Sequence, residues 1–323
     1  MKTMNGKLLL TGMLAGITAV LLVLGASAQP TLSSILYAAS ALPVLIVGLG
    51  WGNMAAVTAI VTAAAVGAVT VSPMFALAMA IFTLLPAGWI SHLANLARPA
   101  SELGGPDDLM AWYPLSDILL HLCGIVSLAV IALGVMIGYS PELVSQMVDM
   151  IITSTTTADP SLSMDAGQIM QVEGMMLMAL PIVQAGMWVM MLTAAFYIAS
   201  RIVAASGHAL RPREDIPSAM RMNRNALFIF LAGIVACFVG GTAALIGATI
   251  CGAFGAGFVM AGFASMHART RGKDWRTPVL IIAYLSLLMF FPLFLFLVIG
   301  LADTGRTVAL TPNGKSGKDQ PKP

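Results

Sequence analysis

The chain has 323 residues, of which 59% are hydrophobic and only 9% are charged, and its mean hydropathy is +0.91. Soluble domains carry about 25% charged residues, so this composition excludes a soluble globular protein and indicates an integral membrane protein embedded in the lipid bilayer. The net charge is only +2, and the basic residues form short clusters beside apolar runs without interleaved aromatic residues, which excludes a nucleic-acid-binding protein.

The beginning of the chain has two interpretations. Lys2 and Lys7 precede an apolar run, and an Ala-Ser-Ala sequence at 26–28 follows it, as in a cleaved signal peptide. The alternative is a first transmembrane helix that is retained. Because several further apolar segments follow, we favour a retained helix near residues 8–28.

A long uncharged stretch comes next. No Asp, Glu, Lys or Arg occurs from Leu8 to Ala97, and about 20 apolar residues span a bilayer as a helix. Turn-forming residues near 29–30, 50–53 and 72–73 divide this stretch. We therefore expect four helices, near residues 8–28, 32–50, 53–71 and 74–96. A polar loop follows at 98–114, and a fifth helix is expected over 115–138.

The segment 140–174 is acidic and contains no Lys or Arg, which predicts that it lies outside the cell membrane. Its carboxylates are Glu142, Asp149, Asp159, Asp165 and Glu173. Residues 141–152 place Leu143, Val144, Met147 and Ile151 on one helical face. Two interpretations remain open: a short helix on the outer membrane surface with a second one near 163–173, or a mobile loop.

A basic loop at 201–224 orients the chain. It follows a sixth expected helix at 175–200 and holds five of the 16 Lys and Arg residues, namely Arg201, Arg211, Arg213, Arg221 and Arg224. Cytoplasmic loops of membrane proteins collect Lys and Arg. We therefore expect this loop, and by counting helices also the amino terminus, on the cytoplasmic side of a bacterial inner membrane.

Three more helices complete the expected fold. Gly240-Gly241 divides an uncharged stretch into helices near 225–239 and 242–266, and a last helix is expected over 277–301. The fold class is all-α and polytopic, with nine transmembrane helices, or eight if the short Gly240 hairpin is miscounted. Residues 1–303 form one membrane domain, and 304–323 form a disordered tail. Nine helices place this basic tail outside, whereas an even number places it inside.

Asp117 and His121 are the first candidates for a ligand site, because residues four apart share one face of a helix. Ionisable residues within a membrane often mark substrate or proton paths, although an acid in the first turn also favours the helix dipole. His92 and Asn95 either face Asp117 across a cytoplasmic vestibule or anchor the membrane interface. Gln184 either lines a cavity or bonds a neighbouring helix.

No catalytic motif is present: the sequence contains no GxSxG, HExxH or Walker A pattern. Cys123, Cys237 and Cys251 fall inside expected helices and form no CxxC pair, and we interpret them as small core residues. We therefore expect no enzymatic activity, no metal and no cofactor. Small residues at helical spacing, as at Gly12 and Gly16, favour close helix packing.

Four segments occur in an order that resembles a known family. They are ALPVLIVGLGWG at 41–52, MAWYPL at 110–115, LRPREDIPSAMRMNR at 210–224 and GLAD at 300–303. In this order they resemble the YybS-like predicted membrane proteins, a family of unknown function, in an alphaproteobacterial form. The resemblance covers most of residues 8–303. The family's GLAD segment continues into an aromatic end bearing Asp and Arg, whereas this chain continues as TGRTVAL.

That family is distantly similar to the substrate-binding subunits of energy-coupling-factor vitamin transporters. Those small helical membrane proteins bind a vitamin and dock on a shared ATPase module through small-residue helix faces. The resemblance implies membrane partner subunits or an ATPase module, and a docking face formed by Gly12, Ala15, Gly16 and Ala19. It is a fold-level analogy and does not establish a function.

Two hypotheses follow. In the first, the protein is a component of a transport system for a vitamin-like small molecule, which binds in a pocket that opens outward beneath residues 140–174. Without ATP-binding residues, such a component needs a partner for energy. In the second, it is a non-transporting scaffold or cell-envelope assembly protein that contacts partners through the acidic segment or the loop 201–224. A cavity among the helices favours the first hypothesis, and tight packing throughout favours the second.

Overall fold

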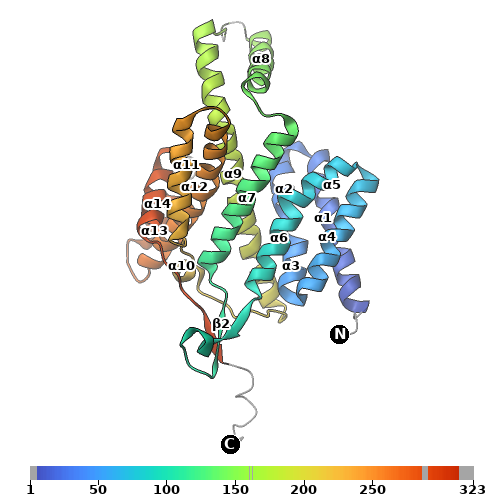
Figure 1. The fold of residues 1–323 in the computed structure, drawn as a ribbon, viewed down its shortest axis with the longest axis vertical. Helices are drawn as coiled ribbons and strands as arrows, with labels where there is room; N and C mark the ends of the chain where they lie inside the picture. The colour runs from blue at the N-terminus through green and yellow to red at the C-terminus, as the bar shows by residue number, and fades with distance from the viewer. Residues whose placement is uncertain (1–5, 160, 162, 286–289, 313–323) are drawn as a thin grey trace, which may run out of the picture. The chain divides into compact units, whose positions relative to one another are not determined.

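The computed structural model describes residues 6–159, 161, 163–285 and 290–312, which are mainly helical (Figure 1). The chain divides into two compact units. Unit 1 contains residues 1–122, 190–224 and 257–323, and unit 2 contains 123–189 and 225–256. Three continuous helices run from one unit into the other: α7 (Leu115–Ile137), α9 (Ala166–Ala205) and α12 (Gly241–Arg269).

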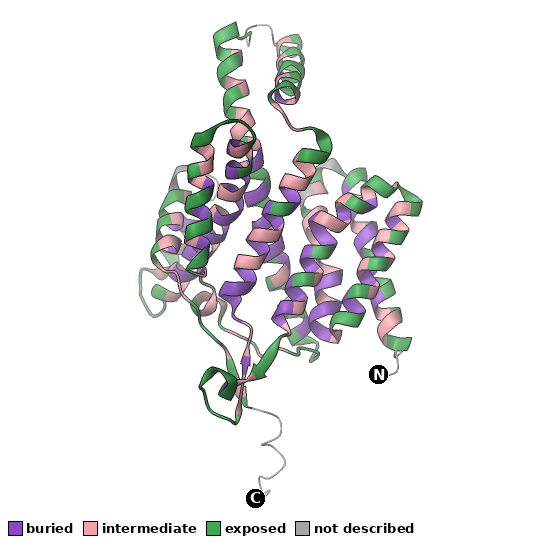
Figure 2. Cartoon of the chain, viewed as in Figure 1, coloured by how far each residue is buried: buried purple, intermediate pink, exposed green. Residues whose placement is uncertain are grey.

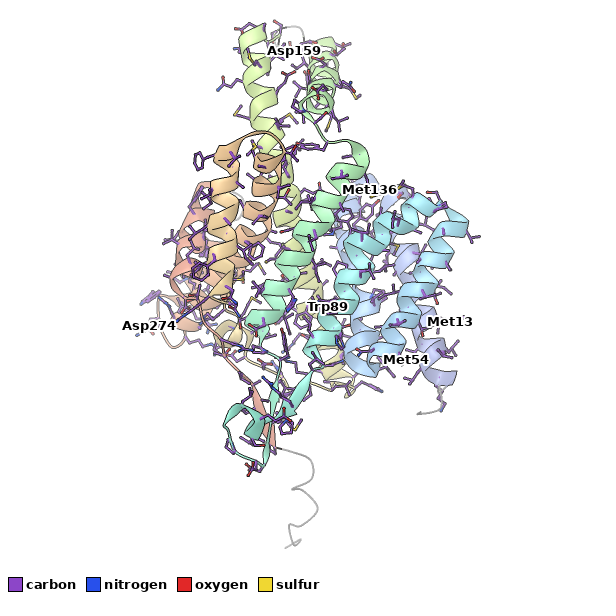
Figure 3. All side chains as sticks on the ribbon, viewed as in Figure 1. Met13, Met54, Trp89, Met136, Asp159 and Asp274 are labelled. Atoms are coloured by element: carbon purple, nitrogen blue, oxygen red, sulfur yellow. The ribbon has the colours of Figure 1, made fainter. Side chains whose placement is uncertain are left out.

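Among the described residues, six helical segments are long and apolar enough to cross a membrane, so the helical membrane class predicted from composition is supported by length and hydropathy. They are α1 (Gly6–Ala28), α4 (Asn53–Thr70), the segment Pro73–Ala94, α7, α9 and α12. Residues such as Met13 on α1 and Met54 on α4, both labelled in Figure 3, are exposed, as lipid-facing side chains are.

The first part of unit 1 is a bundle of α1, α3 (Leu42–Trp51), α4 and α6 (Leu85–Ala94), whose facing sides carry the buried residues (Figure 2). Small residues bring α1 and α4 close together. A Cβ atom on Gly12 would lie 2.6 Å from the Ala55 carbonyl oxygen, and one on Gly16 would overlap the Ala59 carbonyl oxygen. The two helices therefore run in the same direction, and the amino-terminal end of α1 lies level with the start of α4.

Two of the expected helices in this bundle differ from a regular α-helix. The second is split into α2 (Ser33–Ala39) and α3, because Pro43 in the first turn of α3 has no N–H to continue the earlier helix. The fourth consists of α5 (Pro73–Met79), a π-helical turn at Ala80–Leu84 and α6. Pro86 follows this turn. Proline has no N–H to donate, and the wider π turn accommodates the missing main-chain hydrogen bond. The helix expected over 74–96 is confirmed as one continuous helical segment, Pro73–Ala94, whereas the one expected over 32–50 is interrupted between Ala39 and Leu42.

The last part of unit 1 packs two short helices on α12. The single helix expected over 277–301 is wrong: α13 (Arg276–Leu285) and α14 (Phe290–Ala302) are separate helices, and residues 286–289 lie outside the described part of the chain. Phe263 of α12 stacks on Phe296 with ring centroids 3.9 Å apart and also stacks on Tyr284. Val259 and Ala283 complete this core.

Both ends of the α13–α14 pair meet the carboxyl end of α12. Arg276 begins α13 directly after the turn that follows Arg269, the last residue of α12. Asp303, which follows α14, accepts a hydrogen bond of 2.5 Å from Ser265 and lies 3.6 Å from the Arg269 guanidinium. Helix α13 therefore leads away from the carboxyl end of α12, and α14 returns to that same end.

A small antiparallel sheet joins distant parts of unit 1. It has the order β1 (Ala97–Pro99), β2 (Leu109–Trp112) and β3 (Leu310–Pro312). Ala97 pairs with Trp112, and Met110 pairs with Thr311. The disordered tail expected over 304–323 is therefore corrected for residues 304–312, which are held by this pairing. The rest of that predicted tail, 313–323, lies outside the described residues.

In unit 2, the acidic segment is helical. Helix α8 (Pro141–Ala158) starts at Ser140, whose hydroxyl accepts a bond from the Leu143 amide, as predicted for a helix beginning at Pro141. Ser154, Thr155, Thr156 and Thr157 do not break the helix, which continues to Ala158. The hydroxyls of these four residues donate to backbone carbonyls three or four residues earlier, at 2.6–2.9 Å, so their hydrogen bonds are made within the helix.

The second short helix expected near 163–173 is the first part of α9, which has 40 residues. Asp165 and Gln168 form a reciprocal capping pair, with amide-to-side-chain bonds of 2.9 Å in both directions, and this pair starts the helix. Ser145 of α8 donates to the Glu173 carboxylate at 2.6 Å, so α8 is fastened to α9. The predicted sixth helix at 175–200 is correct in place but much too short.

Helix α11 (Asn225–Val239) and the first part of α12 form an antiparallel hairpin in unit 2. Gly240 and Gly241 both have positive φ, as the sequence break predicts. Gly247 lies so close to α11 that an added Cβ would be 2.6 Å from the Gly233 carbonyl oxygen. Helix α11 has only 15 residues, which corresponds to a length of about 22 Å.

Candidate binding cavity

Unit 2 contains a cavity of about 350 Å³ between four helices. The carboxyl end of α7, the start of α8, residues 180–184 of α9 and residues 242–249 of α12 form its wall. Most of the lining is aliphatic, including Leu133, Leu143 and Leu245. Ligand pockets in proteins have this size and this mainly apolar character, with a few polar groups that orient the ligand.

Four polar side chains face this cavity. Tyr139 donates its hydroxyl hydrogen to the Leu177 carbonyl at 3.1 Å, and Thr249 donates to the Leu245 carbonyl at 2.9 Å. Their hydroxyl oxygens remain able to accept one more hydrogen bond. Gln184 and Thr242 make no side-chain hydrogen bond with any described residue. The cavity therefore offers both donors and acceptors within an apolar wall, and Gln184 is a candidate ligand residue that the sequence named.

Asp117 lies elsewhere, in a polar network of unit 1 at the start of α7. Its side chain is buried and accepts a hydrogen bond of 2.5 Å from the Asn223 amide, and it forms an ion pair of 2.8 Å with Arg306. A second carboxylate, Asp303, pairs with Arg221 at 2.9 Å. Asp117 therefore ties the segments around 223 and 306 to α7, which is a structural task.

His121, the residue paired with Asp117 in the sequence, has different neighbours. Its Nε2 atom lies 3.1 Å from the Tyr113 hydroxyl, and its ring lies 6.1 Å from the ring of Trp89. Trp89, labelled in Figure 3, also lies 5.8 Å from the ring of His92. The structure thus places both His92 and His121 near one tryptophan, while Asp117 is engaged with Asn223 and Arg306.

His92 and Asn95 contact the end of α3 and the start of α4. The His92 Nδ1 atom lies 2.8 Å from the Asn53 amide nitrogen, and Asn95 donates to the Gly48 carbonyl at 2.8 Å. These bonds hold α6 to α3 and α4 within the bundle. Among the described residues, neither side chain makes a hydrogen bond or ion pair with Asp117.

The small-residue face of α1 is occupied within the chain. Gly12, Ala15, Gly16 and Ala19 are all buried, and the two glycines lie against α4. A partner subunit that docked on this face would first have to displace α4. The docking residues implied by the family resemblance therefore serve packing inside unit 1 in this structure.

The described basic residues are confined to one of the two units. Every described Lys and Arg lies in unit 1, whereas unit 2 has the five carboxylates of segment 140–174 and no Lys or Arg. The sequence showed the acidic segment and the basic loops separately. It could not show that all of the described basic residues would belong to one structural unit.

Sequence reasoning missed most of the cavity wall, because aliphatic residues that line a cavity look the same in a sequence as those that face lipid. It also missed a buried pair in unit 1, Arg211 with Glu214, which the family motif contained but which had no assigned role. The two residues are three apart in a loop, and this spacing was the only indication of their pairing.

No protein-family model matches the chain, and no curated protein and no solved structure is significantly similar to it. The resemblance to the YybS-like proteins therefore stays a prediction. Function has to be argued from the cavity, the charge distribution and the packing alone.

Proposed function

We propose that the protein is a multi-pass inner-membrane protein that binds a small, largely apolar molecule in the unit 2 cavity, as the solute-binding component of a transport system. The observation that carries this proposal is the cavity of about 350 Å³ with its four polar side chains. A scaffold protein has no need of such a space among its helices. The absence of an ATP-binding motif in the sequence means that energy for uptake would come from a partner subunit.

The ligand is expected to be uncharged or to carry a charge outside the cavity, since no Asp, Glu, Lys, Arg or His lines it. An isolated charge in this wall would have no counter-ion, and its burial would be costly. The amide of Gln184 and the hydroxyl of Thr242 are free to bond a carbonyl, an amide or a ring nitrogen. The chemistry fits a compact apolar molecule with one or two neutral polar groups.

The membrane topology that we propose has eight crossings instead of nine. They are α1, α2–α3, α4, α5–α6, α7, α9, α11 and α12. Helices α13 and α14 are not counted as a crossing, because Arg276 at the start of α13 and Asp303 after α14 both lie at the carboxyl end of α12. They form a re-entrant pair that enters and leaves on one side.

This topology removes the conflict over the carboxyl-terminal segment. Residues 303–312 contact the loop at 201–224 through Asp303, the loop at 98–114 through β3 and the start of α7 through Arg306. We place these segments, all described basic residues and the amino terminus in the cytoplasm, following the positive-inside rule. The acidic segment with α8 then lies outside, at the opposite ends of α7 and α9.

Cysteine labelling tests this topology. In a background without the three native cysteines, we expect Ser154→Cys on α8 to react with a membrane-impermeant maleimide added to intact cells whose outer membrane is permeable to it. Ser101→Cys and Val308→Cys should react only in inverted vesicles, because both lie beside the β sheet. All three positions are exposed. Labelling of residue 308 together with residue 154 would restore the nine-helix count.

Filling the cavity tests the binding function. We expect Ile246→Trp, which places an indole in the cavity, to eliminate a small molecule that co-purifies with the wild-type protein, as measured by mass spectrometry of the extracted complex. Gln184→Leu should weaken its retention by about tenfold, the equivalent of one lost hydrogen bond. Val235→Trp is the matched control, because residue 235 is exposed on α11 and does not line the cavity.

A molecule that is retained equally by wild type, Ile246→Trp and Val235→Trp would not bind in this cavity. If no small molecule distinguishes the wild type from Ile246→Trp after gentle extraction, the transport proposal fails, and the scaffold hypothesis takes its place.

A further inference from the structure

Unit 1 contains a second cavity, of about 240 Å³, with a lining quite different from that of unit 2. The ends of α3 and α6, the carboxyl end of α9 and the loop 209–217 surround it. Its charged and amide-bearing lining residues include Asn95, Arg201, Arg211, Arg213, Glu214 and Arg271. None of these residues belongs to the cavity that we propose as the solute site.

Arg211 is the most buried of the cations, with a side chain only 10% exposed. Its Nη1 group donates to the carbonyl of Ala94, the last residue of α6, at 3.1 Å, and its Nε group donates to Glu214 at 2.6 Å. Burial lowers the pKa of Arg211, and the charge of Glu214 raises it. The guanidinium is thus fixed in place by a helix end and a carboxylate.

One nitrogen of this guanidinium, Nη2, has hydrogen-bond donors that are not used. The Nη2 group lies in the ion pair with Glu214, yet it is buried and makes no hydrogen bond with any described residue. An arginine presents five N–H donors in a planar fork, which suits the oxygens of carboxylates and phosphates. The unused donors are available to an anion in the cavity.

The other charges of the lining do not cancel. Arg271 is matched by Asp215 in a two-bond ion pair at 2.5 and 2.6 Å, which lowers the pKa of Asp215 to about 2. Arg201 and Arg213 have no ion-pair partner among the described residues. Four arginines and two carboxylates line the cavity, so its net charge is 4 − 2 = +2.

Asn95 adds a neutral group at the same place. Its amide nitrogen donates to the Gly48 carbonyl, which fixes the orientation of the side chain. Its Oδ1 atom is buried and accepts no hydrogen bond from any described residue. An orphaned acceptor of this kind is costly, and a hydroxyl group on a ligand would satisfy it.

We propose that this cavity binds a phosphate ester that also carries a hydroxyl group. The phosphate lies between Arg201, Arg211 and Arg213, and the hydroxyl donates to Asn95. Charge-assisted bonds from arginine to phosphate are among the strongest hydrogen bonds in proteins, and basic pockets beside membrane helices accept lipid head groups. The same chemistry is present in a soluble phosphate ester and in a glycerol-based phospholipid head group.

The test compares these two sources on the purified full-length protein. In the soluble arm, thermal unfolding in a neutral detergent is measured with inorganic phosphate and with glycerol 3-phosphate. In the lipid arm, the protein is reconstituted with phosphatidylcholine and phosphatidylglycerol, and native mass spectrometry counts the retained anionic lipid. We expect binding in at least one arm, and about tenfold weaker binding by Arg201→Gln/Arg213→Gln.

The matched control is Arg98→Gln/Arg224→Gln, which removes the same charge from exposed positions on segments that do not line the cavity. This control should bind as the wild type does. Binding of glycerol 3-phosphate identifies a soluble ester as a ligand, and retention of phosphatidylglycerol alone identifies a lipid. The proposal is overturned if neither ligand binds, or if both double variants lose binding equally, because the effect would then be a general attraction of the basic surface.

Discussion

Gly262→Ala and Gly300→Ala are each expected to destabilise unit 1 by about 3 kcal/mol, the upper range for overpacking, because the added methyl group meets backbone and not a movable side chain. A Cβ atom on Gly262 would overlap the carbonyl oxygen of Phe296, and one on Gly300 would overlap that of Phe258. Helices α12 and α14 cross at these two glycines. The measurement is the thermal unfolding temperature in detergent.

Gly124→Ala provides the control for this prediction. Gly124 lies within α7, and an added Cβ atom there meets nothing within 4 Å. We expect a neutral result or a gain of about 0.5–1 kcal/mol, since alanine favours the helix over glycine. If Gly262→Ala is as stable as Gly124→Ala, the close crossing of α12 and α14 is incorrect, and with it the re-entrant pair.

The second large effect is expected at Asp117. Asp117→Asn should cost about 2 kcal/mol, because it removes the ion pair to Arg306 and weakens the bond from Asn223 at a buried site. The cost is smaller than for a fully buried pair, since Arg306 is 55% exposed and regains water when the carboxylate is lost. The measurement is limited proteolysis of residues 304–312, which should become cleavable as β3 detaches.

Asp108→Asn is the matched control, because Asp108 is exposed in the loop between β1 and β2 and forms no ion pair with a described residue. It should leave the proteolysis pattern unchanged. Equal protection of residues 304–312 in wild type and Asp117→Asn would mean that the sheet alone holds this segment.

Hydropathy and breaking residues were sufficient to predict α1, α4, α7 and α11 within a few residues. This worked because a helix in lipid must form all of its backbone hydrogen bonds within itself. Pro, Gly and polar residues therefore mark where such a helix ends. The same method failed at α8 and α9. There the ends depend on side-chain bonds, such as the hydroxyls of 154–157 and the Asp165–Gln168 cap, which composition does not reveal.

Long-range pairing limited the prediction in unit 1. Strands of three or four residues have no visible periodicity, and β3 pairs with β2 across all of the intervening helices. The candidate site showed the same limit. Gln184 could be named because a polar residue is conspicuous in an apolar helix, whereas the pairing of Asp117 with Arg306 joins residues far apart in the chain and left no trace in local sequence.

The order of synthesis gives the small sheet a further consequence. Strands β1 and β2 emerge from the ribosome before α7, but their partner β3 follows α14, and the bond between Trp112 and Thr311 spans 199 residues. During the insertion of all intervening helices, the edge of β2 stays open, and open strand edges attract foreign strands. Closure of the sheet is therefore a late event in biogenesis, and chains that stall before α14 would expose an edge that quality-control proteases can recognise.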